Sequence, residues 1–150
     1  MKNIQTHSPE ETEACGARLA EYMISHPDLP PFIALFGDLG VGKTAFTRGY
    51  ASVYVPDVPV RSPTFALVNE YKNGKMSLFH FDMYRIENED DLDSIGFYDY
   101  LDRPGVCLVE WSEKIPFALP DRYLRVTIEK ISDGSPDDRN IRIEEVLLSC

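Results

Sequence analysis

Two fully apolar runs stand out in the pattern of hydrophobic and polar positions along the chain. They are 32–36 (FIALF), which follows Pro31, and 106–109 (VCLV). Short apolar runs between turn residues are typical of strands that are buried on both faces of a sheet. The pattern therefore predicts two central strands, each covered on both sides by other elements.

Two other segments have the spacing of amphipathic helices. Residues 8–11 (SPEE) combine a serine N-cap, a proline in the first turn and a glutamate that completes a capping box. Apolar residues then recur at positions 15, 19, 22 and 23, on one helical face, and the helix is expected to end near His26-Pro27. A second helix is expected from about Lys43 to Tyr54, with its large apolar side chains on one side.

Alternation of polar and apolar residues predicts two further strands, at 65–71 and 76–82. The link between them, 72–75 (KNGK), contains Asn-Gly, the strongest short-range signal for a β-hairpin. An antiparallel hairpin is therefore expected where a simple alternating α/β protein would have a crossover. Later strands are expected at 123–131 and 141–146, on either side of a turn-rich segment.

Together these elements predict an α/β fold: a central, mostly parallel sheet flanked by helices, with an inserted antiparallel hairpin and C-terminal strands. A length of 150 residues is typical of one domain, so we expect residues 1–150 to form a single unit. The 43% of hydrophobic residues and 27% of charged residues are ordinary for a globular protein, so composition leaves this prediction unchanged.

Charge and cysteine content limit the function classes. The formal net charge of −10 should repel a nucleic-acid backbone, so a partner is expected to hold any RNA. Three cysteines without C-x-x-C spacing suit a reducing cytoplasm and argue against a structural zinc site. No apolar run approaches a membrane span and no apolar leader is visible, so we expect a cytoplasmic protein without membrane association.

Five acids in 87–93 indicate a solvated helix start, with a docking face for a basic partner as the alternative.

The strongest chemical signal is the segment 37–44, GDLGVGKT, which fits the phosphate-binding P-loop pattern G-x-x-x-x-G-K-[ST]. It lies between the first apolar strand and the second expected helix, which is the context that the motif requires. Glycines allow successive N–H groups to face phosphate oxygens, and the helix adds its positive dipole end. The Lys43 ammonium can reach the terminal phosphates, and the Thr44 hydroxyl can ligate Mg²⁺.

Two acids could complete the metal site, because ligands of open α/β sheets bind at the carboxyl ends of strands. Glu110 follows the apolar run 106–109, and Asp82 follows the second arm of the expected hairpin. Glu110 is favoured because its strand is the better candidate for a central strand, and a contribution from both acids stays open. For either acid, the alternative is a carboxylate that caps a strand end.

Four further residues are candidates for the site. Ser62-Pro63-Thr64 resembles a switch in which Thr64 presents its hydroxyl to Mg²⁺ or to the terminal phosphate, and a strand-initiating Ser-Pro turn is the equal alternative. Trp111 directly follows Glu110, and either lies near the nucleotide or a partner or is buried in the core. His80 shares a strand face with Asp82 and is interpreted as a structural histidine.

Some signals point away from other nucleotide-dependent proteins. The sequence has no [NT]-K-x-D element, which disfavours guanine recognition, and the D-x-x-G match at 93–96 follows no apolar strand and is treated as a coincidence. Arg61 and Arg85 lie close in sequence to the switch and to Asp82, but neither is identifiable as an arginine finger. The residue that activates water is not identified by the sequence.

Several ordered segments together resemble the bacterial TsaE family, also called YjeE. They are GDLGVGKTAFTRG (37–49), SPTFALVNEY (62–71), HFDMYRI (80–86), LDSIGFYDYL (92–101) and VCLVEW (106–111). The resemblance implies a P-loop NTPase-like fold and a small ATPase. Because no arginine finger is identifiable, we expect it to hydrolyse ATP slowly on its own. Proteins of this family assist formation of N6-threonylcarbamoyladenosine in tRNAs that read codons beginning with A, with a TsaB–TsaD-like heterodimer as partner.

The resemblance also implies roles for individual residues. The cofactors would be ATP and Mg²⁺, and tRNA would be contacted only through the partners. Catalytic roles fall to Lys43, Asp82 and Glu110, and metal-binding roles to Thr44, Glu110 and Asp82. The residues implied in nucleotide binding are Gly37, Asp38, Leu39, Gly40, Val41, Gly42, Lys43, Thr44, Ala45, Ser62, Thr64 and Trp111. Two other classes stay open: a small-molecule or nucleoside kinase, and a non-catalytic, nucleotide-gated assembly module.

Overall fold

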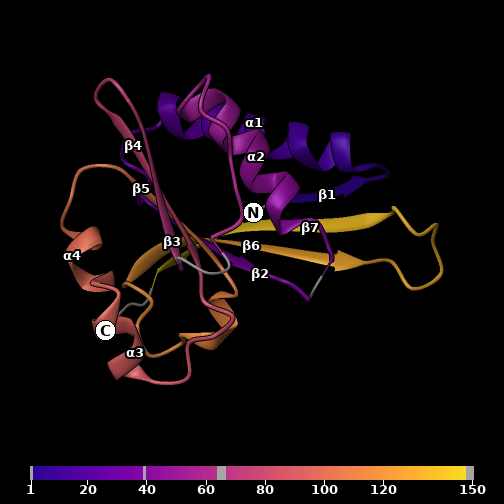
Figure 1. Cartoon of the computed structure of the whole chain (residues 1–150). Coiled ribbons are helices and arrows are strands. Elements are labelled where there is room, and N and C mark those ends of the chain that lie inside the picture. The colour runs from indigo at the N-terminus through magenta and orange to yellow at the C-terminus, as the bar shows by residue number, and fades with distance from the viewer. Residues whose placement is uncertain (1, 39, 64–66, 148–150) are drawn as a thin grey trace.

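The computed structural model describes residues 2–38, 40–63 and 67–147, and within them seven strands form one sheet with helices on both faces (Figure 1). The strands are β1 (Lys2–Thr6), β2 (Phe32–Phe36), β3 (Val68–Asn73), β4 (Met76–Asp82), β5 (Val106–Glu110), β6 (Arg122–Lys130) and β7 (Arg139–Leu147). The helices are α1 (Pro9–Ser25), α2 (Lys43–Tyr54), α3 (Glu89–Ser94), α4 (Phe97–Leu101) and the 3₁₀ turn η1 (Ser112–Lys114).

The strand order is β1-β7-β6-β2-β5-β4-β3. Four neighbouring strands, β6, β2, β5 and β4, are mutually parallel, and antiparallel strands extend the sheet at both edges. The expected α/β fold with a parallel centre, an inserted hairpin and C-terminal strands is therefore confirmed. The edge strand β1 was not expected, because five residues that are mostly exposed carry almost no periodic signal.

The two faces of the sheet pack against different helices. Along β2, Ile33 and Leu35 point into a core shared with α1 and α2, whereas Phe32 and Ala34 point into a core shared with α3 and α4. Figure 1 shows α1 and α2 together on one side of the sheet and α3 and α4 on the other. This two-sided burial is why the strand reads as a continuous apolar run rather than as an alternating one.

Local sequence signals locate most of the element boundaries. The side chain of Ser8 accepts a hydrogen bond from the Glu11 N–H at the start of α1, as expected for an N-cap. The hairpin of β3 and β4 turns at Gly74, where φ is +62°. Asn88 caps α3 by accepting from the Asp91 N–H, and the acids of its first turn lie at the helix end that favours negative charge.

The hairpin differs from the expectation at its first strand. The predicted strand 65–71 begins only at Val68. Its first two residues lie outside the described part of the chain, and Leu67 has a φ of +66°, which no regular strand accommodates. Among the described residues, no helix is both long and apolar enough to cross a membrane.

Candidate functional site

The P-loop connects β2 to α2 with a backbone that depends on glycine. Gly37, Gly40 and Gly42 have φ values of +150°, +78° and +112°, a region that side chains strongly disfavour. A Cβ on Gly37 would also lie 2.6 Å from the carbonyl oxygen of Ile128 on β6. The loop is therefore held close to the sheet and leads directly into the N-terminus of α2. Leu39, one of the residues implied in nucleotide binding, lies outside the described residues.

Lys43 is buried, with 5% of its surface exposed, and its ammonium lies inside the loop. Nζ donates hydrogen bonds to the carbonyl oxygens of Gly37 and Asp38, the latter at 3.3 Å. It also lies 3.7 Å from the centre of the Trp111 ring, a cation–π contact. Lys43 and Trp111 are thus brought together at the loop. Thr44 and Ala45 follow in the first turn of α2, both half-buried.

Asp82 and Glu110 lie side by side at the carboxyl ends of neighbouring parallel strands. The register of β4 on β5 pairs Asp82 with Glu110, and the N–H of Met83 donates to the Glu110 carbonyl oxygen at 3.0 Å. The second arm of the hairpin, β4, is thus also one of the central parallel strands. The position of its strand therefore gives Glu110 no advantage over Asp82 as a metal ligand. The structure supports both acids equally as candidates by position.

The charges of the site act on one another. Burial lowers the pKa of Lys43, and the nearby carboxylates of Glu113, Glu110, Asp82 and Asp38 oppose this shift. Burial raises the pKa of Asp82, which also accepts a hydrogen bond from the Tyr84 N–H at 3.0 Å. The Glu110 carboxylate raises the pKa of Asp82 further. A cation and several carboxylates therefore share one partly dehydrated region beside the loop.

His80 is fully buried and is coupled to Glu110 rather than to Asp82. Its Nε2 donates to Glu110 Oε2 from the adjacent strand, and Glu110 is itself only 5% exposed. This bond satisfies one ring nitrogen of His80, whereas Nδ1 is buried without a hydrogen-bond partner among the described residues, so the interpretation as a fully satisfied structural histidine holds only in part. The bond also orients the Glu110 carboxylate, which leaves its second oxygen for other partners.

The aromatic ring of Trp111 forms one wall of the site. Trp111 is half-buried with a φ of +59°, at the point where β5 gives way to η1. Its ring contacts that of Tyr84 at 5.0 Å between centroids, and Tyr84 is 56% exposed. Trp111 packs partly against the core that α3 and α4 share with the sheet, and its ring also contacts the Lys43 ammonium and an exposed tyrosine.

The proposed switch is only partly described. Thr64 lies outside the described residues, and Ser62 is an exposed residue of the loop before β3. Leu67, which follows the undescribed residues 64–66, contacts one of the two candidate acids, because its carbonyl oxygen accepts from the Asp82 N–H at 3.1 Å. Leu67 N–H in turn donates to the Pro63 carbonyl oxygen at 2.7 Å. Ser62 is separated in sequence from the P-loop by α2, and the contact with Asp82 is made by Leu67, directly before β3.

Two residues at the loop were not found by sequence reasoning. Glu113 Oε2 accepts a hydrogen bond from the Gly37 N–H at 3.1 Å, so an acid from η1 reaches the first glycine of the loop. Arg139 Nε donates to the Val41 carbonyl oxygen at 2.8 Å. Glu113 could have been considered because it lies three residues after Glu110. Nothing local in the sequence points to Arg139.

The donor set beside the loop suits Mg²⁺. Thr44, Asp82 and Glu110 offer hard oxygen ligands, which Mg²⁺ prefers, and no thiolate of the described residues lies among them. The described residues contain no cluster of three histidine, cysteine or acidic side chains that could hold a metal alone. In Mg²⁺ sites of phosphate-binding proteins, one or two carboxylates, phosphate oxygens and water complete the coordination.

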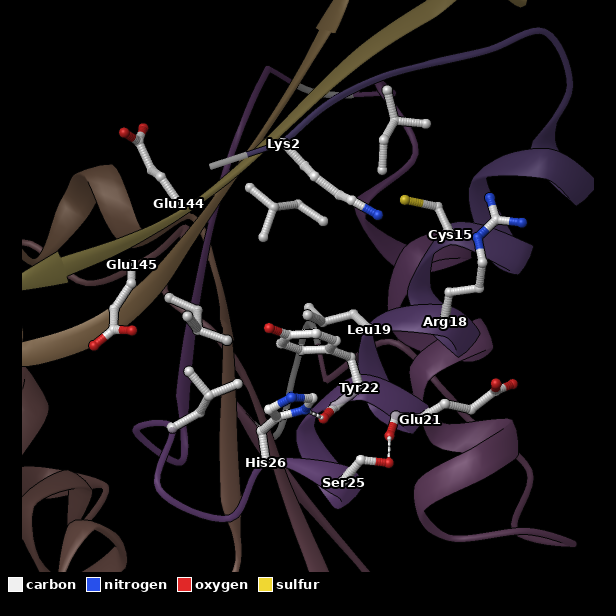
Figure 2. Close-up of a pocket in the computed structure, with 14 residues that line it drawn as sticks. Lys2, Cys15, Arg18, Leu19, Glu21, Tyr22, Ser25, His26, Glu144 and Glu145 are labelled. Atoms are coloured by element: carbon white, nitrogen blue, oxygen red, sulfur yellow. Dashed lines mark hydrogen bonds between the residues drawn. The ribbon is translucent and has the colours of Figure 1, made fainter.

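A separate groove of about 700 Å³ lies between α1 and the strands β1, β6 and β7. Figure 2 shows Lys2, Cys15 and Arg18 near one end of it and the stacked rings of Tyr22 and His26 near the other. None of its lining residues belongs to the loop 37–44 or to the strand ends that carry the acids. The groove is therefore distinct from the P-loop site.

Comparison with known proteins places the chain in a family. The sequence profile of the family described as "Threonylcarbamoyl adenosine biosynthesis protein TsaE" matches residues 6–141. A Bacillus subtilis protein named "tRNA threonylcarbamoyladenosine biosynthesis protein TsaE" is 39% identical over 148 residues, which cover 97% of this chain and 88% of that protein. A Haemophilus influenzae protein of the same name is 34% identical over 95% of this chain and 90% of its own length.

The fold has a solved counterpart. The crystal structure of Bacillus subtilis YdiB is similar to this chain with a TM-score of 0.71 and 32% sequence identity. The similarity covers 97% of this chain and 85% of that structure. It extends beyond the P-loop and its flanking elements, through the hairpin and the C-terminal strands.

Proposed function

This chain belongs to the TsaE family of threonylcarbamoyl adenosine biosynthesis proteins, and from that premise we propose that it is a Mg²⁺-dependent ATPase. It serves the N6-threonylcarbamoyladenosine modification of tRNAs that read codons beginning with A. One observation carries the proposal: a buried P-loop lysine lies beside two acids at the ends of adjacent parallel strands. That constellation is what phosphoryl transfer to water requires for holding phosphate and metal.

The loop and Lys43 would bind the triphosphate. The N–H groups of the glycine loop and the positive end of α2 favour an anion, which contributes about 0.3–1 kcal/mol for the dipole alone and more when buried. Lys43 Nζ currently donates to the carbonyl oxygens of Gly37 and Asp38. Phosphate oxygens are stronger acceptors, so the ammonium would exchange those bonds for charge-assisted ones.

The metal-binding residues would be Thr44, Asp82 and Glu110. Bound Mg²⁺ would supply charge neutralisation of the phosphates. His80 keeps one Glu110 oxygen in a fixed direction, and the Tyr84 N–H does the same for Asp82. These bonds limit how far either carboxylate can turn, which favours a defined geometry at the phosphates over a mobile one.

Hydrolysis by the isolated protein is expected to be slow. Neither a water-activating base nor an arginine finger is identified in the chain, and an arginine supplied from outside can add ~10³–10⁵ in rate. We therefore propose that a TsaB–TsaD-like heterodimer in the cytoplasm docks on this protein, changes its turnover and carries the tRNA. The acidic charge of −10 supports indirect rather than direct contact with tRNA.

Steady-state phosphate release tests this function. Wild type and Glu110→Ala are compared, each alone and with the partner heterodimer. Glu110→Ala should reduce turnover more than it weakens ATP binding, because its effect falls on the metal and on transition-state geometry. Fast turnover by the isolated wild type that partners leave unaffected would show that the site is complete in this chain. Phosphorylation of a small acceptor would instead indicate a kinase. ATP binding without phosphate release, even in the presence of the partners, would indicate a nucleotide-gated assembly module.

A further inference from the structure

The P-loop is held from its outer side by a residue that lies 98 positions later in the chain. Arg139, the first residue of β7, donates from Nε to the Val41 carbonyl oxygen at 2.8 Å. Its Nη2 donates to the Gly40 carbonyl oxygen at 3.4 Å. We propose that Arg139 is a positioning residue that sets the direction of the P-loop N–H groups, an inference that rests on the proposed nucleotide-binding function.

The geometry of the peptide bond links these contacts to the inside of the loop. In a planar trans peptide the C=O of one residue and the N–H of the next point in opposite directions. Fixing the Gly40 and Val41 carbonyl groups outward therefore directs the N–H groups of Val41 and Gly42 the other way. The Val41 N–H indeed points across the loop to the Asp38 carbonyl oxygen, at 3.4 Å. No cis peptide bond occurs in the described chain, so the argument holds at these positions.

The loop needs such an external contact because glycines make it permissive. Gly40 and Gly42 both have positive φ, and a glycine crosses to other backbone conformations at little cost. Nothing lies within 4 Å of a Cβ placed on Gly40, so packing does not hold this residue. The side chain of Val41 is buried in the core, which anchors the loop at one point but does not set the peptide planes on either side of it. Arg139 sets both.

The guanidinium of Arg139 is itself fixed. Its Nη1 donates to the carbonyl oxygens of Pro136 and Asp138, at 2.7 Å and 2.9 Å. One planar group with several donors thus joins two carbonyls of the β6–β7 turn to two carbonyls of the P-loop. A lysine ammonium lacks this forked geometry and could not serve both sets in the same way.

The β6–β7 turn, which precedes Arg139, is itself held by β1 and the residue that follows it. The Asp138 carboxylate accepts from the Ser135 N–H at 3.0 Å and contacts His7 Nδ1 at 2.8 Å. Arg139 is paired with Thr6 of β1 in the sheet. The position of the guanidinium is therefore set by two neighbouring elements before it meets the loop.

Nucleotide affinity gives the first test. Trp111 is the single tryptophan of the chain and lies against Lys43, so its fluorescence can report ATP binding. Arg139→Met should weaken Mg·ATP binding at least tenfold, and Arg139→Lys should fall between it and wild type. The matched control is Arg142→Met on the same strand, whose guanidinium pairs with surface acids at 3.6 Å and 3.9 Å. It should bind within twofold of wild type.

Arg139→Met should also change KM and kcat for ATP to different extents, which a general loss of stability would not do. The loop holds phosphates in the ground state and in the transition state alike, so KM for ATP should rise about tenfold while kcat stays within threefold. In the nucleotide-free protein, the amide ¹H–¹⁵N resonances of Val41 and Gly42 should shift or broaden in Arg139→Met. They should be unchanged in Arg142→Met.

The outcomes separate this inference from the proposed function. If wild type binds no ATP, the proposed function fails, and the Val41 and Gly42 amide resonances still decide whether Arg139 sets the loop. If wild type binds ATP and Arg139→Met binds within twofold of it with unmoved amide resonances, the positioning role is overturned. Should Arg139→Met not fold, Arg139→Lys decides: wild-type affinity and resonances in that variant also overturn the proposal.

Discussion

At the scale of single residues, the site is built around a buried lysine that forms no ion pair with a carboxylate of the described residues. Lys43 donates to backbone carbonyls and lies on the Trp111 ring, while the nearby acids act on it from a greater distance. A buried ammonium with only such neutral acceptors is costly relative to one with an ionic partner. An anionic ligand would relieve this cost, which supports the proposed role of the lysine in binding phosphate.

Replacing Lys43 tests this assignment. Lys43→Ala should weaken Mg·ATP binding by at least tenfold, about 1.4 kcal/mol, and leave the fold intact, because the change removes a buried charge. Its Trp111 emission without nucleotide should also change, since the cation leaves the ring. Calorimetry measures the affinity, with exposed Lys114→Ala as control. An unchanged Mg·ATP affinity in Lys43→Ala would contradict the assignment of the phosphate-binding site.

The His7–Asp138 pair gives stability a pH dependence. The hydrogen bond to Asp138 raises the pKa of His7 above 6.5, and the bond to His7 lowers the pKa of Asp138 below 3.8. The pair's contribution is therefore fully present between these two pH values. It is lost as the pH rises through the folded pKa of His7 or falls through that of Asp138.

The variant His7→Gln keeps a polar side chain without the charge. Its thermal midpoint should lie below that of wild type between pH 3.8 and 6.5 and approach it at alkaline pH. Thermal unfolding followed by circular dichroism across the pH range measures the difference. A gap between the two proteins that is the same at acid and alkaline pH would contradict the charged pair.

At the scale of elements, the P-loop helix depends on its contact with α1. Gly16 of α1 and Gly49 of α2 meet the backbone of the opposite helix, where a Cβ would lie 2.1 Å from the Phe46 carbonyl oxygen and 1.7 Å from the Glu13 carbonyl oxygen. Such distances are possible only for glycine, so the two helices pack at unusually close range. α1 therefore sets the direction from which α2 presents its N-terminus to the loop.

Gly49→Ala should force the two helices apart. The added methyl group collides with backbone, which cannot rotate away as a side chain could, so we expect a loss of at least about 3 kcal/mol in the free energy of unfolding. Urea denaturation measures it. Arg48→Ala on the exposed face of the same helix should change stability by no more than about 0.5 kcal/mol. Equal stability of the two variants would show that the helices tolerate separation.

At the scale of the whole molecule, charge decides what the protein can approach. The chain has 25 acidic and 15 basic residues. Several arginines are already paired with acids on the C-terminal strands, among them Arg122 with Glu145 and Arg125 with Glu144. Such pairing leaves the acidic excess uncompensated on the surface, which opposes contact with a phosphate backbone.

The isolated protein should therefore not bind tRNA appreciably. A gel-shift titration at micromolar protein in ~150 mM salt should show free tRNA only. Addition of the partner heterodimer should retain tRNA and this protein in one complex. A shift by the protein alone at that salt concentration would mean that a local basic surface outweighs the net charge.

The sequence by itself determined what depends on neighbours in the chain. Caps, turns, glycines with positive φ and apolar runs leave patterns within a few residues, and so α1, α2, β2, β5 and the hairpin were all predicted close to their observed bounds. The P-loop was evident for the same reason, because a contiguous segment carries its chemistry. The weak points were short or irregular segments, such as β1 and the start of β3.

Only the tertiary structure decided which distant residues share the site. Strand order and register bring Asp82 beside Glu110, join His80 to Glu110 across 30 positions, and set Arg139 against Val41 across 98. The sequence placed both acids at strand ends but could not align them, because register is set by packing across the sheet and not by spacing along one strand. Arg139 has no local signal, since its hydrogen-bond acceptors are backbone carbonyls that every residue possesses. Contacts of this kind are determined by the fold as a whole, and they form only once the strands of the sheet are paired.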